Sequence, residues 1–177
     1  MVSTELIGKY PDYEFIGEET YIPGMQLTDA PTFIVDPIDG TTNFVHSFPC
    51  VCISLGFTIR KLPTVGVIYN PFLDELYTAI KGHGAFVSRN GAEKIRLPLK
   101  KNPEPLKDLS TALVGAEWGS DRKGANFDLK AKVFAKLAAA KEDGGSMVHS
   151  LRSMGSAALN LAAVSAGHLD MYWEGGW

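Results

Sequence analysis

Apolar residues fall on alternate positions through much of the first half of the chain, which is the period of β-strands. Residues 51–59 show this alternation most clearly, residues 64–69 repeat it, and residues 76–80 form a further expected strand. Asn90-Gly91 is a strong hairpin signal between the short apolar segments on either side of it. The pattern predicts an antiparallel meander.

The second half of the chain changes to a mixture of helical spacing and short strands. Residues 127–141 carry apolar side chains at helical spacing, and Leu129 is expected in the buried set. Gly144-Gly145 is expected to end this helix. Ser156 is placed to cap a second helix over residues 157–166. Three short strands are expected in this half, at residues 111–115, around residues 147–148 and at residues 170–174.

The proline-rich stretch at residues 100–107 is expected to be a loop between two halves of the sheet system. The N-terminal residues 1–13 are expected to be the end of a helix that leads into a strand at Phe15-Ile16.

The candidate functional residues are concentrated after the apolar run Phe33-Ile34-Val35. This run is expected to be a strand, and Asp36 is expected at its end. Pro37 favours an extended conformation for Asp36, so the carboxylates of Asp36 and Asp39 are expected around a tight turn. Gly40-Thr41-Thr42 then resembles a helix start, where free amides favour an anion. Two carboxylates that face an anion site indicate magnesium and phosphate. Taken alone, however, Asp-Pro and Asp-Gly fit an ordinary solvent-facing turn equally well.

Composition narrows the class of protein. With 177 residues, 45% of them hydrophobic and 21% charged, the chain reads as one globular domain. The net charge is −3 and the 17 Lys and Arg residues are scattered, so no nucleic-acid partner is indicated. We expect no membrane span, because no apolar run is long enough, and no signal peptide, because Glu5 and Lys9 interrupt the first residues. A cytoplasmic location is the default.

The thiols and imidazoles suggest no metal site of their own. Cys50 and Cys52 lie two residues apart in the strand pattern, where a disulfide would be strained, and they are interpreted as small core residues. His46 and His83 have no partner at ligand spacing, and hard cations prefer oxygen, so both are interpreted as structural or surface residues.

The string from Asp36 to Pro49, DPIDGTTNFVHSFP, resembles the signature of the inositol monophosphatase family of magnesium-dependent, lithium-sensitive phosphatases. A Gly-Glu-Glu-Thr segment lies upstream, as in that family, although paired glutamates would otherwise fit a solvated surface. The resemblance implies that the amides of Gly40 and Thr41 bind phosphate and that Thr41 orients the attacking water. It implies direct hydrolysis without a phosphoenzyme. The implied Mg²⁺ ligands are Glu18, Asp36, Asp39 and the carbonyl of Ile38.

Later segments resemble the same family more weakly. Residues 152–158 match its Arg-Ser-x-Gly-Ser-Ala-Ala pattern, although Gly-Ser-Ala before a helix is usually only a cap. The resemblance implies a structural ion pair between Arg152 and Asp170. The implied substrate contacts are Ser120, Gly155, Ser156, Ala157 and Glu174.

The resemblance implies an α/β (α+β) layered sandwich of the sugar-phosphatase type, with mostly antiparallel sheets and alternating helix layers. Residues 1–177 are expected to form one such domain, which lacks the family's N-terminal helices and its C-terminal Trp-Asp motif. The implied activity is Mg²⁺-dependent hydrolysis of a small phosphorylated polyol, in a homodimer. Inositol monophosphate is the first choice for the substrate. The alternatives are another lithium-sensitive phosphatase, acting on a fructose bisphosphate, histidinol phosphate or 3′-phosphonucleotide, and a catalytically impaired fragment with a binding role.

Overall fold

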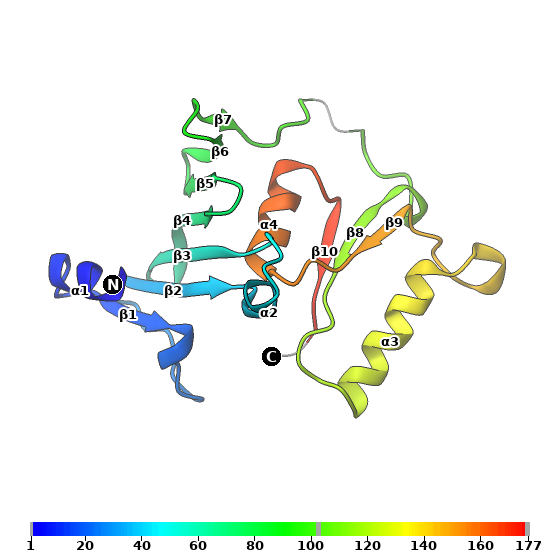
Figure 1. The fold of residues 1–177 in the computed structure, drawn as a ribbon, viewed down its shortest axis with the longest axis horizontal. Helices are drawn as coiled ribbons and strands as arrows, with labels where there is room; N and C mark the ends of the chain where they lie inside the picture. The colour runs from blue at the N-terminus through cyan, green and yellow to red at the C-terminus, as the bar shows by residue number, and fades with distance from the viewer. Residues whose placement is uncertain (1, 102–103, 176–177) are drawn as a thin grey trace. The chain divides into compact units, whose positions relative to one another are not determined.

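The computed structural model describes residues 2–101 and 104–175. The chain divides into two compact units, Met1–Leu97 and Pro98–Trp177, and each is described by itself. The boundary falls at the start of the predicted proline-rich loop, whose described residues form no helix or strand, whereas Pro103 lies outside the described residues. The ribbon is drawn in Figure 1.

The first unit is built on a seven-stranded sheet whose strands follow their order in the sequence. Helix α1 (Val2–Lys9) precedes it, as expected. All neighbouring strands are antiparallel except the first two, which are parallel. The predicted meander is therefore confirmed. The strands are β1 (Glu14–Gly17), β2 (Thr32–Asp39), β3 (Cys52–Ile59), β4 (Leu62–Asn70), β5 (Glu75–Ile80), β6 (Gly84–Arg89) and β7 (Ile95–Arg96).

The hairpin predicted at Asn90-Gly91 joins β6 to β7, and both turn residues have left-handed backbone angles, with φ of 50° and 66°. Such angles match the right-handed twist of the flanking strands. The turn between β3 and β4 uses the same conformation at Arg60 (φ 52°) and Lys61 (φ 61°), where the sequence carries no glycine or asparagine to signal it.

Aromatic stacking holds the first strands of this unit to the segment that follows α1. The rings of Phe33 and Phe57 lie 4.8 Å apart on the paired strands β2 and β3. Tyr13 stacks on Phe57 at 5.5 Å, and Tyr10 stacks on Tyr13 at 5.2 Å. The aromatic side chains on one face of β2 and β3 thus pack against the N-terminal segment and are half-buried.

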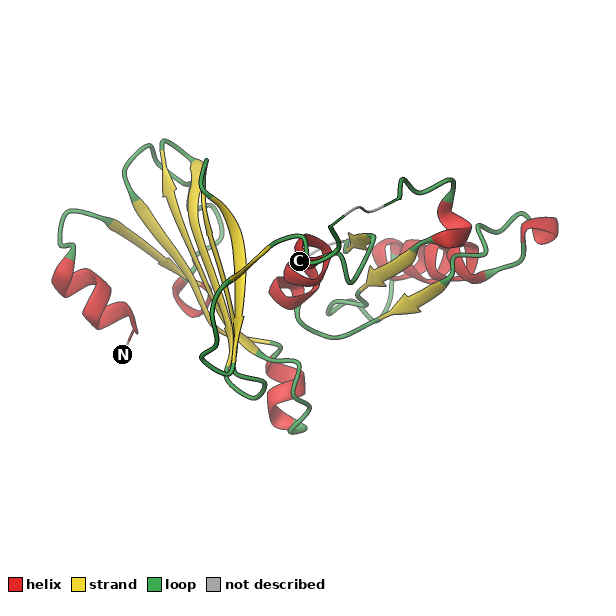
Figure 2. Cartoon of the chain, turned by 90° about the horizontal axis from the view of Figure 1, so that it is seen from above, coloured by secondary structure: helices red, strands yellow, loops and turns green. Residues whose placement is uncertain are grey.

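The second unit has three parallel strands, β8 (Leu113–Ala116) between β10 (Met171–Trp173) and β9 (Ser150–Arg152). Helix α3 (Ala125–Ala138) connects β8 to β9, and α4 (Ala157–Ala166) connects β9 to β10. Parallel neighbours need such crossovers. Together with the larger antiparallel sheet, this sheet agrees with the expectation of mostly antiparallel sheets. The three-stranded sheet and its two helices are seen from above in Figure 2.

The two helices cover opposite faces of this sheet. Val114 of β8 lies in a buried cluster with Ala112 and Val148, and Leu137 of α3 packs against that cluster. A side chain at Gly115, the next residue, would meet the side chain of Asn160 on α4. Because successive strand residues face opposite sides, α3 and α4 lie on opposite faces. The layered α/β architecture is confirmed.

Two helix expectations need correction. α3 ends at Ala138, before Lys141, because Ala139 is extended; Gly144 (φ 77°) instead ends a short 3₁₀ turn at Lys141–Asp143. Leu129 was expected in the buried set, but it is 55% exposed, whereas the neighbouring Lys130 is only 1% exposed. The Nζ atom of Lys130 donates a hydrogen bond to the carbonyl of Trp118 at 2.8 Å, which explains why a lysine can occupy the buried position.

The caps of α4 agree with the sequence, whereas one strand is displaced. The Oγ atom of Ser156 accepts a hydrogen bond from the amide of Leu159 at 3.2 Å and caps α4, and Gly167 (φ 79°) ends that helix. The strand expected around residues 147–148 lies slightly later, at β9. In the first unit, Cys52 is buried, as expected for a core residue, and Cys50 is half-buried.

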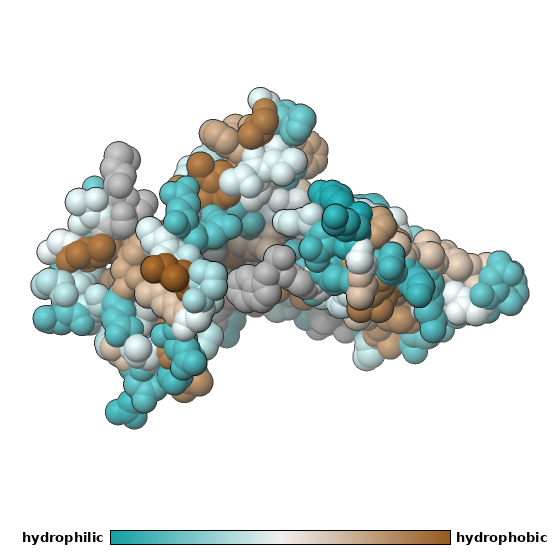
Figure 3. All heavy atoms as spheres, turned by 90° about the horizontal axis from the view of Figure 1, so that it is seen from below, coloured by the Kyte–Doolittle hydropathy of each residue, from teal (hydrophilic) through white to brown (hydrophobic). Residues whose placement is uncertain are grey.

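Within the described ranges, none of the helices combines the length and the apolar character needed to cross a bilayer. Figure 3 shows that apolar side chains also reach the surface among polar ones, and Val45 and Leu161 are examples of exposed apolar residues.

Candidate functional site

The register of β1 against β2 places two of the predicted acidic residues side by side. The two strands are parallel, and Gly17 pairs with Val35. The next residue on each strand is therefore Glu18 on one side and Asp36 on the other. Glu18 begins a short 3₁₀ turn, Glu18–Thr20, immediately after β1, which matches its predicted position at a strand end.

The environment of Asp36 is acidic and partly buried. Burial, above all, raises the pKa of Asp36 from 3.8 to about 6. A hydrogen bond with Glu18 and the negative charges of Glu18 and Asp39 contribute to this rise, while the amide of Ile38, which donates to Asp36 Oδ1 at 2.9 Å, opposes it. Acidic side chains therefore surround Asp36, and no basic side chain is among the causes of its pKa shift. A bound cation would reduce the repulsion between these carboxylates.

Asp36 and Asp39 are not related by the tight turn that the sequence suggested. β2 continues through both residues, and its pairing with β3 shifts between them, from Asp36 opposite Ser54 to Asp39 opposite Cys52. The extra residue on β2 makes a bulge, and Pro37, which has no amide hydrogen for the ladder, lies inside it.

Asp39 has its own partner on β3, because the thiol of Cys52 donates to Asp39 Oδ2 at 3.7 Å. Among residues 2–101 and 104–175, no three side chains of His, Cys, Asp or Glu are grouped closely enough to hold one metal ion. The structure therefore brings Glu18 to Asp36, whereas the complete ligand set of Glu18, Asp36, Asp39 and the Ile38 carbonyl stays a prediction.

The expected helix start follows directly after these acids. Gly40 has φ of 94°, a left-handed conformation that favours glycine, and it precedes the short helix α2 (Thr41–Val45). The carbonyl of Gly40 accepts a hydrogen bond from the amide of Phe44 at 2.9 Å. Amides of a first helical turn have no acceptor within the helix, so Gly40 and Thr41 begin a segment that can donate to an anion.

Two asparagines for which no site role was predicted hold the loop after α2. The side-chain amide of Asn43 donates to the carbonyl of Cys50 at 2.8 Å, and that of Asn70 donates to the carbonyl of Pro49 at 2.9 Å. Asn70 is only 1% exposed, and its Oδ1 also accepts from the amides of Phe72 and Leu73. The sequence signal for Asn70 was its position at the end of an expected strand, directly before Pro71.

In the second unit, the predicted substrate contacts all follow the carboxyl ends of its strands. Ser120 follows β8, Gly155 to Ala157 follow β9, and Glu174 follows β10. Because the three strands are parallel, these residues lie at one edge of the sheet. Ser120, Gly155 and Glu174 are exposed, and Glu174 accepts a hydrogen bond from the hydroxyl of Tyr172. Ser156 is buried and its hydroxyl caps α4.

The ion pair expected between Arg152 and Asp170 is wrong. Arg152 donates to the hydroxyl of Ser150 at 2.6 Å and to the carbonyl of Leu151, and Asp170 accepts from the amide of Leu113 at 2.7 Å. A carboxylate at the start of β10 reaches the backbone of the adjacent strand β8 more directly than it reaches an exposed guanidinium.

Glu117, the residue that follows β8, was not among the predicted site residues. Its side chain is buried and accepts hydrogen bonds from the loop that precedes α4. Nothing in the local pattern distinguishes this glutamate from a surface one, because its donors lie on a segment distant in the sequence.

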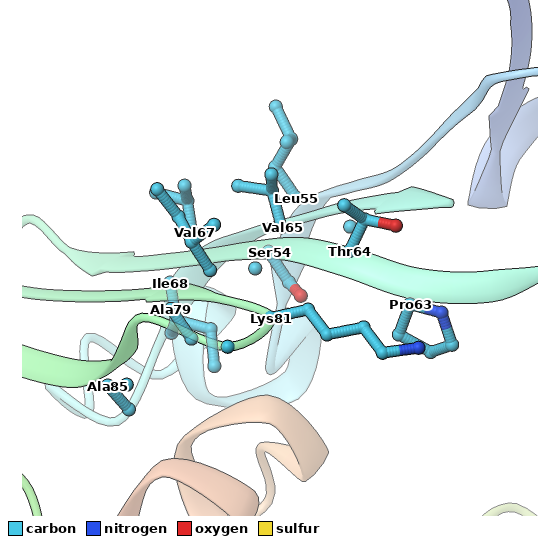
Figure 4. A pocket seen from close by; sticks show the side chains of 15 residues that line it. Ser54, Leu55, Pro63, Thr64, Val65, Val67, Ile68, Ala79, Lys81 and Ala85 are labelled. Atoms are coloured by element: carbon cyan, nitrogen blue, oxygen red, sulfur yellow. The ribbon is translucent and has the colours of Figure 1, made fainter. Parts of the chain in front are cut away.

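A groove of about 810 Å³ on the first unit is separate from the acidic residues. Its walls are mostly apolar side chains of β3, β4 and β5, including Leu55, Val65 and Val67 (Figure 4). Lys81 is its one charged lining residue among those the structure describes, so it offers no carboxylate to a cation.

Comparison with known proteins now identifies the family. The model of the inositol monophosphatase family matches residues 1–177. Inositol monophosphatase 2 of Saccharomyces cerevisiae is 44% identical over 180 residues, which cover 99% of this chain and 58% of that protein. The inositol monophosphatase of Anabaena (Nostoc) sp. PCC 7120 superposes with a TM-score of 0.79 at 33% identity, and the match covers 99% of this chain and 63% of that structure.

The structure of Staphylococcus aureus inositol monophosphatase II with bound inositol monophosphate gives a TM-score of 0.73 at 28% identity, over 97% of this chain and 58% of that one. The chain thus spans little more than half the length of the relatives that it matches. It carries the sequence pattern and the fold that these proteins share. The chain belongs to the inositol monophosphatase family.

Proposed function

We propose that this chain carries the acidic site of a Mg²⁺-dependent phosphatase whose substrate is inositol monophosphate. The observation that carries the proposal is the contact between Glu18 and Asp36, directly before the glycine turn at Gly40. Membership of the family supports the reaction class, and the relative with bound inositol monophosphate supports the substrate.

The donors on β1 and β2 suit a hard cation. Carboxylate and carbonyl oxygens are the ligands that Mg²⁺ prefers. The pKa of Asp36 is raised mainly by burial and also by the neighbouring charges of Glu18 and Asp39, which a cation would neutralise. When bound, Mg²⁺ supplies positive charge to the phosphate oxygens and makes water more acidic. The residues that would hold it are Glu18, Asp36, Asp39 and the Ile38 carbonyl.

Residues of the chain bind the phosphate group and orient the attacking water. The amides of Gly40 and Thr41 bind phosphate oxygens, and the Thr41 hydroxyl orients a water molecule toward phosphorus. The water oxygen forms a new bond to phosphorus while the ester P–O bond breaks, and the alcohol leaves with a proton. No covalent intermediate on the protein is needed.

The predicted substrate contacts of the second unit have the chemistry to bind a polyol. Glu174 is exposed and can accept hydrogen bonds from polyol hydroxyls, and Ser120 can both donate and accept. Gly155, Ser156 and Ala157 supply the start of α4, whose backbone lies at the same edge of the sheet.

Phosphate release tests the proposal. The full-length protein is assayed at saturating Mg²⁺ with inositol 1-phosphate, fructose bisphosphate, histidinol phosphate and a 3′-phosphonucleotide. We expect the highest kcat/KM with inositol 1-phosphate, inhibition by Li⁺, and loss of activity in Asp39→Asn but not in the exposed Asp12→Asn control. Preference for another monoester would reassign the substrate, and no release with any of them would favour the catalytically impaired fragment.

The homodimer is proposed on the same basis as the substrate, and light scattering of the purified protein tests it. A monomer at micromolar concentration would reject it.

A further inference from the structure

Glu117 is a buried carboxylate that accepts hydrogen bonds from residues 153–155 and from Asn160. It follows the end of β8 and is 8% exposed. Its Oε1 accepts from the amides of Met154 at 2.8 Å and Gly155 at 2.9 Å, and from the side chain of Asn160 at 2.7 Å. Its Oε2 accepts from the hydroxyl of Ser153 at 3.0 Å.

These donors replace a cationic partner. The ion pairs within the described ranges are Arg89–Glu75 and Lys141–Asp108, and neither includes Glu117. A buried carboxylate needs compensation, and two backbone amides, an amide side chain and a hydroxyl provide it. This arrangement is specific to the carboxylate, because an apolar residue of similar size would leave all four donors without their acceptor.

The location of the donors links Glu117 to the proposed substrate contacts. Met154 and Gly155 belong to the loop between β9 and α4, and Gly155 is one of those contacts. Gly155 has φ of 77°, so a bend of the chain occurs at the residue whose amide Glu117 fixes. Asn160 lies on α4 itself and is fully buried, so the same carboxylate also holds the helix.

We propose that Glu117 is a positioning residue that sets the loop at residues 153–155 and the start of α4 for substrate binding. This inference rests on the proposed function. Glu117 acts on the loop through the amide of Gly155 and on α4 through the side chain of Asn160. Ser120 lies three residues after Glu117 in the segment that follows β8. A shift of Glu117 would therefore disturb two predicted substrate contacts together, Ser120 after β8 and Gly155 after β9.

Three variants separate positioning from general stabilisation. Glu117→Gln retains the size of the side chain and one oxygen for the bonds that Oε1 accepts, and the hydroxyl of Ser153 can accept from the new amide. Glu117→Ala removes every acceptor. Ser153→Ala removes only the bond to Oε2 and serves where the alanine variant at position 117 does not fold. Glu142→Gln, an exposed glutamate, is the control.

The experiment measures amide exchange by NMR and steady-state kinetics with inositol 1-phosphate on the full-length protein. For Glu117→Ala we expect faster exchange at Met154 and Gly155 and a KM raised at least about tenfold, with a smaller change in kcat. Glu117→Gln should restore both readouts to within about threefold of the wild type, and Ser153→Ala should raise KM about two- to threefold.

Each readout can overturn the inference separately. Unchanged exchange at Met154 and Gly155 in Glu117→Ala would show that the carboxylate does not hold the loop. Faster exchange with an unchanged KM would show that the loop is held for stability alone. A wild-type protein that hydrolyses no phosphate monoester would reject the proposed function, and that result is distinct from an active wild type whose KM does not respond to Glu117.

Discussion

Glu18 and Asp36 lie at the same end of two adjacent parallel strands, and their carboxyl groups interact directly. This pair joins two motifs that are separate in the sequence. It also means that the site holds like charges together, which costs stability unless a cation or a proton is present. The first predictions test that cost.

Replacing Asp36 with asparagine should weaken Mg²⁺ binding at least about tenfold, because it removes a charged ligand. The metal-free protein should be no less stable than the wild type, since the substitution also removes the repulsion from Glu18 and Asp39. Calorimetry measures the first effect and thermal melting the second. Wild-type Mg²⁺ affinity in this variant would remove Asp36 from the site.

Added Mg²⁺ or Mn²⁺ should raise the melting temperature of the wild-type chain. An ion present at one hundred times its dissociation constant stabilises the folded state by about 2.7 kcal/mol. The increase should be absent in Asp36→Asn and retained in Asp12→Asn. A wild-type melting curve that does not respond to millimolar metal would argue against a cation site at these acids.

Acid stability should depend on Asp108, at the start of the second unit. Hydrogen bonds from Ser110, and then from Lys141, lower the pKa of Asp108 from 3.8 to about 2. The folded pKa lies below the unfolded one, so this stabilisation is present above pH 4 and is lost as the pH falls toward 2. Melting temperatures should therefore fall less between pH 4 and pH 2 in Asp108→Asn than in the wild type. The exposed Asp143→Asn variant should keep the wild-type slope.

Lys61→Gly should stabilise the turn between β3 and β4. Lys61 has φ of 61°, which is unfavourable for a side chain with a Cβ atom and acceptable for glycine. We expect a gain of about 0.5–1 kcal/mol in the free energy of unfolding by urea denaturation. Lys94→Gly, at a position without a left-handed angle, should give no gain. A loss in Lys61→Gly would show that the lysine side chain contributes more than its backbone angle costs.

Local features of the sequence were sufficient to predict much of the fold. The alternation of β3 to β5, the Asn90-Gly91 turn and the Ser156 cap depend on residues close in the chain, and the structure confirms each of them. The family motif after Phe33 likewise lies in one continuous stretch, so the sequence alone predicted Asp36, Asp39 and the glycine turn at Gly40.

Contacts between residues that are far apart in the sequence were decided by the tertiary structure. The parallel pairing of β1 with β2 determines that Glu18 meets Asp36, and no pattern within either strand specifies that register. Burial is equally non-local: helical spacing favoured Leu129 for the core, but the carbonyl of Trp118 accepts from Lys130 and makes that position the buried one. Glu117 is the clearest case, because its charge is compensated by donors on a loop and a helix far along the chain. Short-range periodicity and capping are encoded residue by residue, whereas strand register and the partners of buried polar groups exist only once the chain has folded.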